Sequence, residues 1–452
     1  MVDRYNISPL DDRYRRELEV LVPYVSEFAL NRYRVRVEIE YLIALGEEKD
    51  IPELPPLPSS HREHLRSLYR NFSPRDFRAI KNRETRTGHD VKAVEYFLRR
   101  KLDTIGLGVY GPWIHYALTS EDINNLAYGL MWKEALETVY LPLLERLQTR
   151  LNALAHRYKN LSMLALTHGQ PATPTSLGKE FAVFHHRLAR QLKQLTSHSL
   201  EGKLSGASGT WSAHTVGHPR VNWFRFTRHF ISSLGLTPTL LTTQIPSQDS
   251  LAESYHLLIR VNTILIDLCR DLWLYTSRGI FRLKIREGEI GSSTMPHKVN
   301  PIHFENAEGN AGLAVAYFSH LAQTLPVSRL QRDLSGSTAI RNQGVALGHS
   351  LLALKNLLKG LERVAVDRTR ISRELEGHWE VLAEAVQTVL RKRGRGDPYQ
   401  KLQSLTRGKT VSRQQMTEFI ENLDLPDEDK ERLLSLTPET YTGLAAKAVE
   451  AM

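Results

Sequence analysis

The segment QDSLAESYHLLIRVNTILIDLCRDLWLYTS, from Gln248 to Ser277, indicates what kind of fold this chain adopts. Its apolar residues recur at intervals of three, four and seven, in the series Leu251, Leu258, Val261, Leu265, Leu268 and Leu272. Because an α-helix turns once every 3.6 residues, this spacing puts them all on one face of a helix. The segment is therefore predicted to be one long amphipathic helix.

Four other stretches repeat this periodicity. One follows TSEDINN and carries Leu143, Leu147, Leu151 and Leu154, and the others span 176–200, 304–325 and 339–364. The first of these begins with a capping-box pattern, Thr119 followed three residues later by Asp122. Pro142 lies inside it and is predicted to kink or split the helix.

Strand-like alternation is nearly absent, so we expect an all-α fold with a central bundle of long helices. A glycine-rich stretch ending at Pro112 and a change to shorter helices after Asp367 predict three domains, 1–112, 113–366 and 367–452. Helices this long present more apolar surface than one thin bundle covers. The pattern therefore favours an oligomer in which helices pack between subunits.

The composition argues against several classes of function. The 452 residues carry a formal charge of +10, but both signs are spread along the chain, and only RKRGRG at 391–396 is concentrated. We interpret that tract as a solvated loop and expect no nucleic-acid binding, whereas scattered arginines suit a small anionic ligand. Even the most apolar segment contains Asp267, Arg270 and Asp271, so we expect no membrane span and a cytoplasmic protein.

The positions of the cysteine and the histidines predict neither a disulfide nor a metal site. The single cysteine, Cys269, has leucine neighbours at helical spacing and is predicted to be a packed thiol. HREH at 61–64 and the pair His185-His186 lack the spacing and acidic partners of a metal site. No Gly-rich nucleotide loop is present, and we expect neither metal nor cofactor.

Polar islands interrupt the helical pattern. Three are TGHDVKAVEYF (87–97), IHYALTSED (114–122) and LTHGQPATP (166–174). The fourth, GEIGSSTMPHKVNP (288–301), continues into IHFENAEGN and contains two glycines and two prolines. Each puts His, Ser, Thr or Asn beside a turn or a helix start, where free backbone N–H groups favour anions. Singly, each island also fits an ordinary cap or a hydrogen-bonded core histidine.

The islands together resemble a known family. GSSTMPHKVNP resembles GSSxMPxKxNP, the signature loop of the fumarase/aspartase superfamily of lyases, and His297 before the loop lysine is the residue found in its adenylosuccinate lyases. DDRY from Asp11, TSEDINNL, THGQPATP and TRGK at 406–409 also resemble this family. The likeness covers nearly the whole chain. It implies β-elimination that cleaves a C–N bond and releases fumarate from adenylosuccinate or SAICAR.

The resemblance also implies roles for individual residues. Ser292 matches the general base, although spacing alone does not distinguish it from Ser293. His168 matches the general acid, Lys298 would stabilise the carboxylate dianion, and Glu305 would orient the imidazolium. His89 matches a catalytic-site histidine near the general acid that also contacts the substrate. The implied phosphate-binding residues are Arg13, Tyr14, Arg332, Ser337 and Arg341. The other implied substrate contacts are Asp90, His115, Thr119, Ser120, Gln244, Asn300 and Asn306.

Some points stay open at the level of sequence. Gly88 stands where close relatives often have Asn, and its role is not assigned. The resemblance implies a homotetramer whose active sites are each built from three subunits, acting on small molecules. The alternatives are another superfamily lyase such as argininosuccinate lyase, a non-catalytic protein on the same fold, and a basic nucleic-acid binder.

Overall fold

The computed structural model describes residues 6–285, 288, 294–295, 297–394, 403, 408 and 411–452. Helices dominate these residues, and the described strands form only three two-stranded sheets. The predicted all-α class is confirmed. Two compact units are present, and each combines three stretches of chain. Unit 1 comprises 1–144, 191–263 and 309–354, and unit 2 comprises 145–190, 264–308 and 355–452. The predicted three-domain division stays a prediction.

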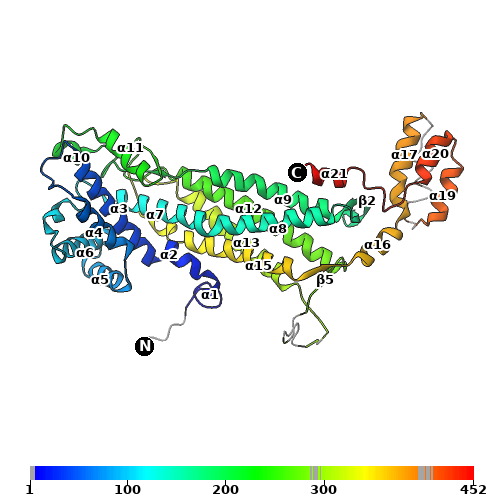
Figure 1. The fold of residues 1–452 in the computed structure, drawn as a ribbon, viewed down its shortest axis with the longest axis horizontal. Helices are drawn as coiled ribbons and strands as arrows, with labels where there is room; N and C mark the ends of the chain where they lie inside the picture. The colour runs from blue at the N-terminus through cyan, green and yellow to red at the C-terminus, as the bar shows by residue number, and fades with distance from the viewer. Residues whose placement is uncertain are drawn as a thin grey trace. The chain divides into compact units, whose positions relative to one another are not determined.

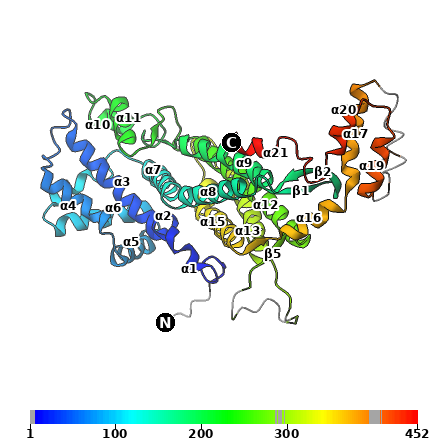
Figure 2. The same ribbon diagram turned by 45° about the vertical axis from the view of Figure 1, so that its right-hand side comes forward.

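Unit 1 holds most of the N-terminal helices. Helix α3 (Glu27–Glu47) contacts α4 (Ser59–Arg70), α5 (Pro74–Thr87) and α6 (Asp90–Thr104), as Figures 1 and 2 show in blue. The remaining short elements of unit 1 are α1 (Arg15–Leu18), α2 (Val22–Val25), α10 (Ser212–Gly217), α11 (Trp223–Ser233), α14 (Ser335–Ile340), β3 (Glu201–Gly202) and β4 (Thr237–Pro238). Short 3₁₀ helices cover Glu19–Leu21 and Gly108–Trp113.

Five long helices have residues in both units: α8 (Leu141–Tyr158), α9 (Leu177–Ser197), α12 (Asp249–Ser277), α13 (Ile302–Thr324) and α15 (Gln343–Glu362). The helix predicted from the opening segment is α12, and the predictions over 176–200, 304–325 and 339–364 correspond to α9, α13 and α15. In unit 1, α12 and α13 pack on α7 (Ser120–Ala135). The Trp132 ring lies edge-on to Tyr255 and Phe318 and donates a 2.8 Å hydrogen bond to Ser254.

Pro142 was predicted to kink or split its helix, and a π-helical turn marks this point, although Ala135, Leu136 and Leu141 keep right-handed helical backbones. Helix α7 ends at Ala135, a π-helical turn covers Leu136–Tyr140, and α8 begins at Leu141. Proline has no N–H and its ring crowds the carbonyl four residues earlier, so the regular hydrogen-bond ladder is interrupted one turn before it.

Unit 2 contains a feature that the sequence analysis did not predict. Strands β1 (Ser162–Thr167) and β2 (Gln170–Ser176) form an antiparallel hairpin across the island at 166–174. A second pair joins β5 (Phe281–Leu283) to β6 (Val364–Val366). Phe281 packs against Phe181 and Tyr275, and Cys269 is fully buried, which confirms its predicted place in the core.

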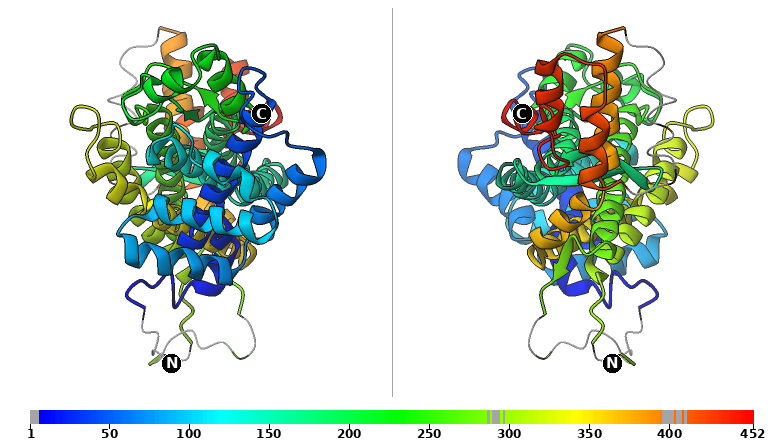
Figure 3. Two further views of the ribbon diagram at one scale, coloured as in Figure 1. Left: turned by 90° about the vertical axis from the view of Figure 1, so that its left-hand side faces the viewer. Right: turned by 90° about the vertical axis from the view of Figure 1, so that its right-hand side faces the viewer.

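The C-terminal helices of unit 2 are short. Helix α17 (Ala383–Lys392), orange in Figure 3, lies beside α20 (Asp427–Leu434), and α20 also contacts α19 (Arg413–Glu421). The other elements here are α16 (Arg368–Glu376), a 3₁₀ turn at Trp379–Leu382 and α21 (Ala445–Glu450).

Candidate active site

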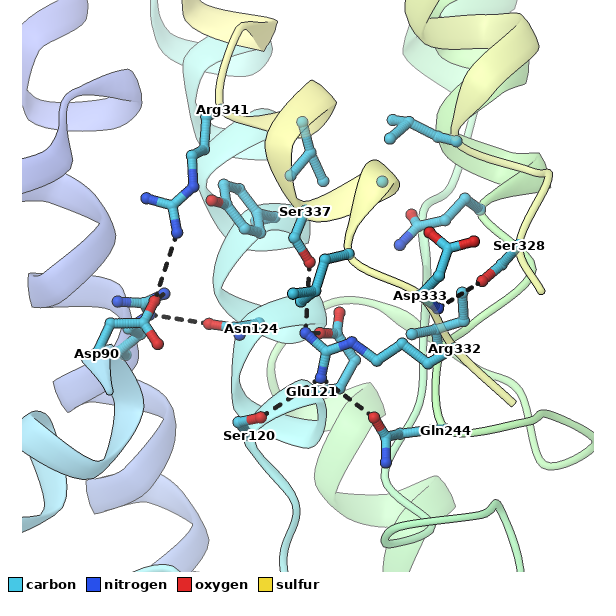
Figure 4. A pocket seen from close by; sticks show the side chains of 18 of the residues that line it. Asp90, Ser120, Glu121, Asn124, Gln244, Ser328, Arg332, Asp333, Ser337 and Arg341 are labelled. Carbon is cyan, nitrogen blue, oxygen red and sulfur yellow. Dashed lines mark hydrogen bonds and ion pairs between the residues drawn. The ribbon is translucent and has the colours of Figure 1, made fainter. Parts of the chain in front are cut away.

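A pocket in unit 1 gathers much of the predicted binding set. Its volume is about 500 Å³, and segments that are far apart in sequence line it. The predicted residues on its wall are His89, Asp90, Ser120, Gln244, Arg332, Ser337 and Arg341. Figure 4 shows the side chains of six of them converging: Asp90, Ser120, Gln244, Arg332, Ser337 and Arg341.

Arg332 is at the centre of this group (Figure 4). Its Nη2 lies 3.1 Å from a Glu121 carboxylate oxygen and donates to Ser337 Oγ at 3.3 Å. Its Nη1 donates to Gln244 Oε1 at 3.2 Å and to Ser120 Oγ at 3.5 Å. The guanidinium is therefore held by acceptors on two sides, and its side chain is 18% exposed.

A second cluster joins Asp90 to two arginines. Arg34 Nη2 donates to the Asp90 carboxylate at 2.6 Å and its Nε donates to Asn124 at 2.9 Å, while Arg341 lies 3.6 Å from Asp90. Burial alone would raise the pKa of Asp90, but Arg34 and Arg341 outweigh it, and the pKa lies below its usual value. Asp90 is thus a carboxylate at neutral pH and fixes both cations at the pocket.

The start of α7 positions Ser120 and Glu121. The predicted capping box is present, and the Thr119 N–H donates to Asp122 Oδ2 at 2.9 Å. Asp122 also accepts 2.7 Å and 3.0 Å hydrogen bonds from Lys203 Nζ and the Ser205 N–H, and the Asp122 and Lys203 side chains are fully buried. This buried ion pair anchors the first turn of α7 to the 203–206 segment. Thr119 itself therefore serves as a cap.

The start of α6 explains Gly88. Gly88 ends α5 with a left-handed backbone (φ 65°), which glycine adopts without steric cost. His89 then becomes the N-cap of α6, and its Nδ1 accepts from the Lys92 N–H at 3.2 Å. The TGHD motif forms the turn between α5 and α6 and places His89 and Asp90 in the wall of the pocket.

Four predicted residues of unit 1 do not line this pocket: Thr119, which caps α7, and His115, Arg13 and Tyr14. His115 lies 2.7 Å from buried Glu38 through Nδ1, and its backbone is left-handed (φ 61°). Burial alone would lower the pKa of His115, but the nearby carboxylates of Glu38, Glu95 and Asp122 raise it overall. Arg13 and Tyr14 precede α1, where the Arg13 guanidinium lies 5.8 Å from the Tyr14 ring centre.

The predicted acid and its orienter belong to unit 2. His168 and Gly169 are the two turn residues between β1 and β2, and both have positive φ, 53° and 71°. This matches a type I′ turn, which lifts the exposed imidazole to the tip of the hairpin. Glu305 lies in the first turn of α13 and accepts a 3.1 Å hydrogen bond from the Trp273 indole.

The signature loop is described only in part. Ser292, the predicted base, lies outside the described residues. Lys298 is exposed, and its N–H donates to the Met295 carbonyl at 3.0 Å. Asn300 lines a small cavity of about 60 Å³, and Asn306 is half-buried on α13.

Several pocket residues were missed by the sequence analysis. They are Arg34, Glu121, Asn124, Tyr128 and Asp333. Arg34 gave no distinct signal, because it is one of several charged residues in α3; only the structure shows that it is buried, and a buried charge needs a partner. Glu121 lies directly after Ser120, but an acidic residue is not expected to bind an anion, so the sequence did not mark it as a site residue.

The described residues hold neither a membrane-spanning helix nor a metal-binding cluster. No described helix is long and apolar enough to cross a membrane. In the same residues, no three His, Cys, Asp or Glu side chains gather as they would around a metal ion.

Comparison with known proteins agrees with this architecture. A family model described as "Lyase" matches residues 37–315, and one described as "Adenylosuccinate lyase C-terminal" matches 328–442. Among solved structures, a fumarate lyase from Mesorhizobium sp. BNC1 superposes with a TM-score of 0.75 at 20% identity, covering 99% of both chains. The 3-carboxy-cis,cis-muconate lactonizing enzyme from Pseudomonas putida gives 0.71 at 23% identity, covering 96% of this chain and 98% of its own. At these identities the two structures show the fold.

Closer relatives share the sequence along nearly its full length. The adenylosuccinate lyase of Haemophilus influenzae is 47% identical over 445 residues, 98% of each chain. The Escherichia coli K12 enzyme of that name is 46% identical with the same coverage. The one from Dictyostelium discoideum is 44% identical over 97% of this chain and 96% of its own. Since both the helical body and the C-terminal part match, the chain belongs to the adenylosuccinate lyase family and is an enzyme of the lyase class.

Proposed function

We propose that this enzyme removes fumarate by β-elimination from adenylosuccinate, giving AMP, and from SAICAR, giving AICAR. Both substrates carry a phosphate and two carboxylates, so a site for them must supply several cationic and N–H or O–H donors. The pocket of unit 1 supports the proposal most directly. Within one cavity it offers Arg332, Ser337 and Arg341, a set of donors suited to a phosphate.

The chemistry divides between a base and an acid. Ser292 removes a proton from the carbon next to a carboxylate, and nearby positive charge and backbone N–H donors activate its hydroxyl for this step. Lys298 stabilises the dianion that then forms. His168 protonates the leaving nitrogen as the C–N bond breaks, and Glu305 holds the imidazolium in place.

The hairpin turn suits His168 for this role. A general acid that donates to a bulky leaving group needs an accessible ring, and His168 is exposed at the tip of a short, two-residue turn. Histidine also has an intrinsic pKa near neutrality, so it can give up a proton and recover it in each cycle.

The remaining contacts and the assembly belong to the same proposal. Asp90, His115, Thr119, Ser120 and Gln244 contact or orient the substrate, with His89 near the acid. Asn300, Asn306, Arg13 and Tyr14 complete the substrate contacts. The enzyme works without a cofactor in the cytoplasm, as a homotetramer whose sites combine residues from three subunits and whose chains each form three domains.

The test is an ultraviolet absorbance assay of the purified full chain with adenylosuccinate. Wild type should release fumarate and AMP, and Ser292→Ala should lose on the order of 10³-fold or more in kcat, because the base is removed. Ser293→Ala is the matched control and should keep most of the activity. Loss of activity only in Ser293→Ala would reassign the base. Turnover of argininosuccinate with none of adenylosuccinate would refute the substrate assignment.

A further inference from the structure

The guanidinium of Arg332 has protein partners at both of its terminal nitrogens. Glu121, Ser337, Gln244 and Ser120 surround its two terminal nitrogens at 3.1 to 3.5 Å. Three of these neighbours are neutral and can share an N–H with an incoming anion. Glu121 differs, because its negative charge competes with that anion for the same cation.

The position of Glu121 makes this competition strong. Its side chain is only 9% exposed, so little water screens its charge. Among the described residues, Arg332 is the only cation within 4 Å of the Glu121 carboxylate. Lys203 pairs instead with Asp122, and Arg34 pairs with Asp90.

The charged groups around Glu121 come from four parts of unit 1. They are Arg332, Lys203, Asp122 on the same helix, and Arg34 on α3. Burial raises the pKa of Glu121 most and Asp122 adds to this, whereas Arg332, Lys203 and Arg34 lower it; the pKa ends above its usual value. A further negative charge beside Arg332 would raise the pKa of Glu121 more, as burial does.

We propose that Glu121 is a proton-linked counter-ion: it holds Arg332 while the pocket is empty and takes up one proton when a phosphate group binds that guanidinium. A phosphate that reaches Ser337, Arg341 and Arg332 brings nearly two negative charges close to the Glu121 carboxylate. Protonation turns the carboxylate into a neutral carboxyl, which removes the repulsion and supplies an O–H donor. The proton comes from solvent, and no covalent bond in the ligand changes.

This inference rests on the proposed phosphate site and extends it. It makes Glu121 a positioning residue, and it makes binding depend on pH. A group whose pKa rises on binding takes up a proton, so the dissociation constant increases as pH rises above the pKa of the free pocket.

Calorimetric titration of the full-length enzyme with AMP tests the proposal. Titrations at pH 7 in buffers with different ionisation enthalpies give the number of protons exchanged per AMP bound. About nine-tenths of free phosphate is already dianionic at this pH, given a second pKa near 6, so the phosphate can only release about 0.1 proton. We expect wild type to take up about 0.5 to 1 proton per site, and its dissociation constant to rise up to about tenfold per pH unit.

Variants identify the group that takes up the proton. Glu121→Gln keeps the shape of the side chain and should abolish most of the uptake and flatten the pH dependence. Glu40→Gln is the matched control, because Glu40 also pairs with an arginine, Arg66, in the same unit, and it should keep the wild-type proton count.

Two outcomes would overturn the proposal, and they differ from failure of the proposed function. Binding of AMP to wild type without proton uptake overturns it even if Glu121→Gln does not fold. Uptake that persists in folded Glu121→Gln assigns the proton to another group. Failure of AMP to bind wild type at all would instead remove the phosphate site itself, and the inference with it.

Discussion

At the scale of single residues, His214 is a buried histidine whose two ring nitrogens have no hydrogen-bond partner among the described residues. Its ring packs 4.7 Å from the Trp223 ring, with Asp122 and Lys203 nearby. Burial lowers the pKa of His214 to about 4, which the Lys203 charge assists and the Asp122 charge opposes. The imidazole is therefore neutral in the native protein at pH 7.

This histidine predicts a loss of stability in mild acid. The unfolded chain protonates at a pKa near 6.5 and the folded chain only near 4, so the unfolded state binds more protons between these values. The contribution of His214 is fully present above pH 6.5 and falls as pH decreases towards 4. By pH 5 it amounts to a loss of about 2 kcal/mol.

His214→Phe isolates that contribution. Phenylalanine can keep the edge-on contact with Trp223, and any packing cost is the same at both pH values. Denaturant unfolding at pH 7 and pH 5, at one protein concentration, should show a smaller acid destabilisation than in wild type. His186→Phe, which replaces an exposed histidine on α9, is the control and should retain the wild-type difference. Equal acid sensitivity in His214→Phe and wild type would contradict this account.

At the scale of elements, the β1–β2 turn imposes a backbone that few residues accept. His168 and Gly169 both have positive φ, which costs most L-residues about 1–2 kcal/mol and suits glycine and asparagine best. His168 adopts this conformation although it is unfavourable for histidine. The imidazole at the tip therefore makes the hairpin less stable than glycine or asparagine would at this position.

Two substitutions separate the turn from the chemistry. His168→Asn supplies the residue that type I′ turns favour, so we expect folding at least as stable as wild type. Activity should nevertheless fall by about 10²-fold or more, because the general acid is gone. Thermal unfolding and the fumarate-release assay measure the two effects. An active, stable His168→Asn enzyme would refute the acid role, whereas His168→Ala could lose activity through the turn alone.

The elements also show what the sequence could predict. Long helices such as α12 follow from apolar periodicity alone, because one face must be buried along the whole length. The hairpin was missed because LTHGQPATP contains two prolines and no Asn-Gly or Asp-Gly turn signal. Residues of the pocket were predicted through motifs, and Arg34 and Glu121 were not. Their role depends on which distant side chains meet them, and local spacing carries no information about that.

At the scale of the whole molecule, the long helices leave apolar side chains uncovered. Leu313 and Tyr317 lie one turn apart on α13 in unit 1 and are 48% and 37% exposed. Trp273 and Leu274 are similarly exposed on α12 in unit 2. Exposed apolar residues at neighbouring positions of a helix are typical of surfaces that bind another subunit. These residues therefore bear on the proposed homotetramer.

Leu313→Glu tests this assembly. In a tetramer that packs through α13, the substitution buries an unpaired charge at the interface, so the complex should dissociate. Light scattering should give about four times the 51.6 kDa chain mass for wild type and a smaller mass for the variant. Activity should fall with the mass if each site uses three subunits.

On a monomer, the same change at an exposed position would alter stability by only about 0.5 kcal/mol and leave activity intact. Leu444→Glu, at a leucine that is 69% exposed near the C-terminus, is the control and should keep both mass and activity.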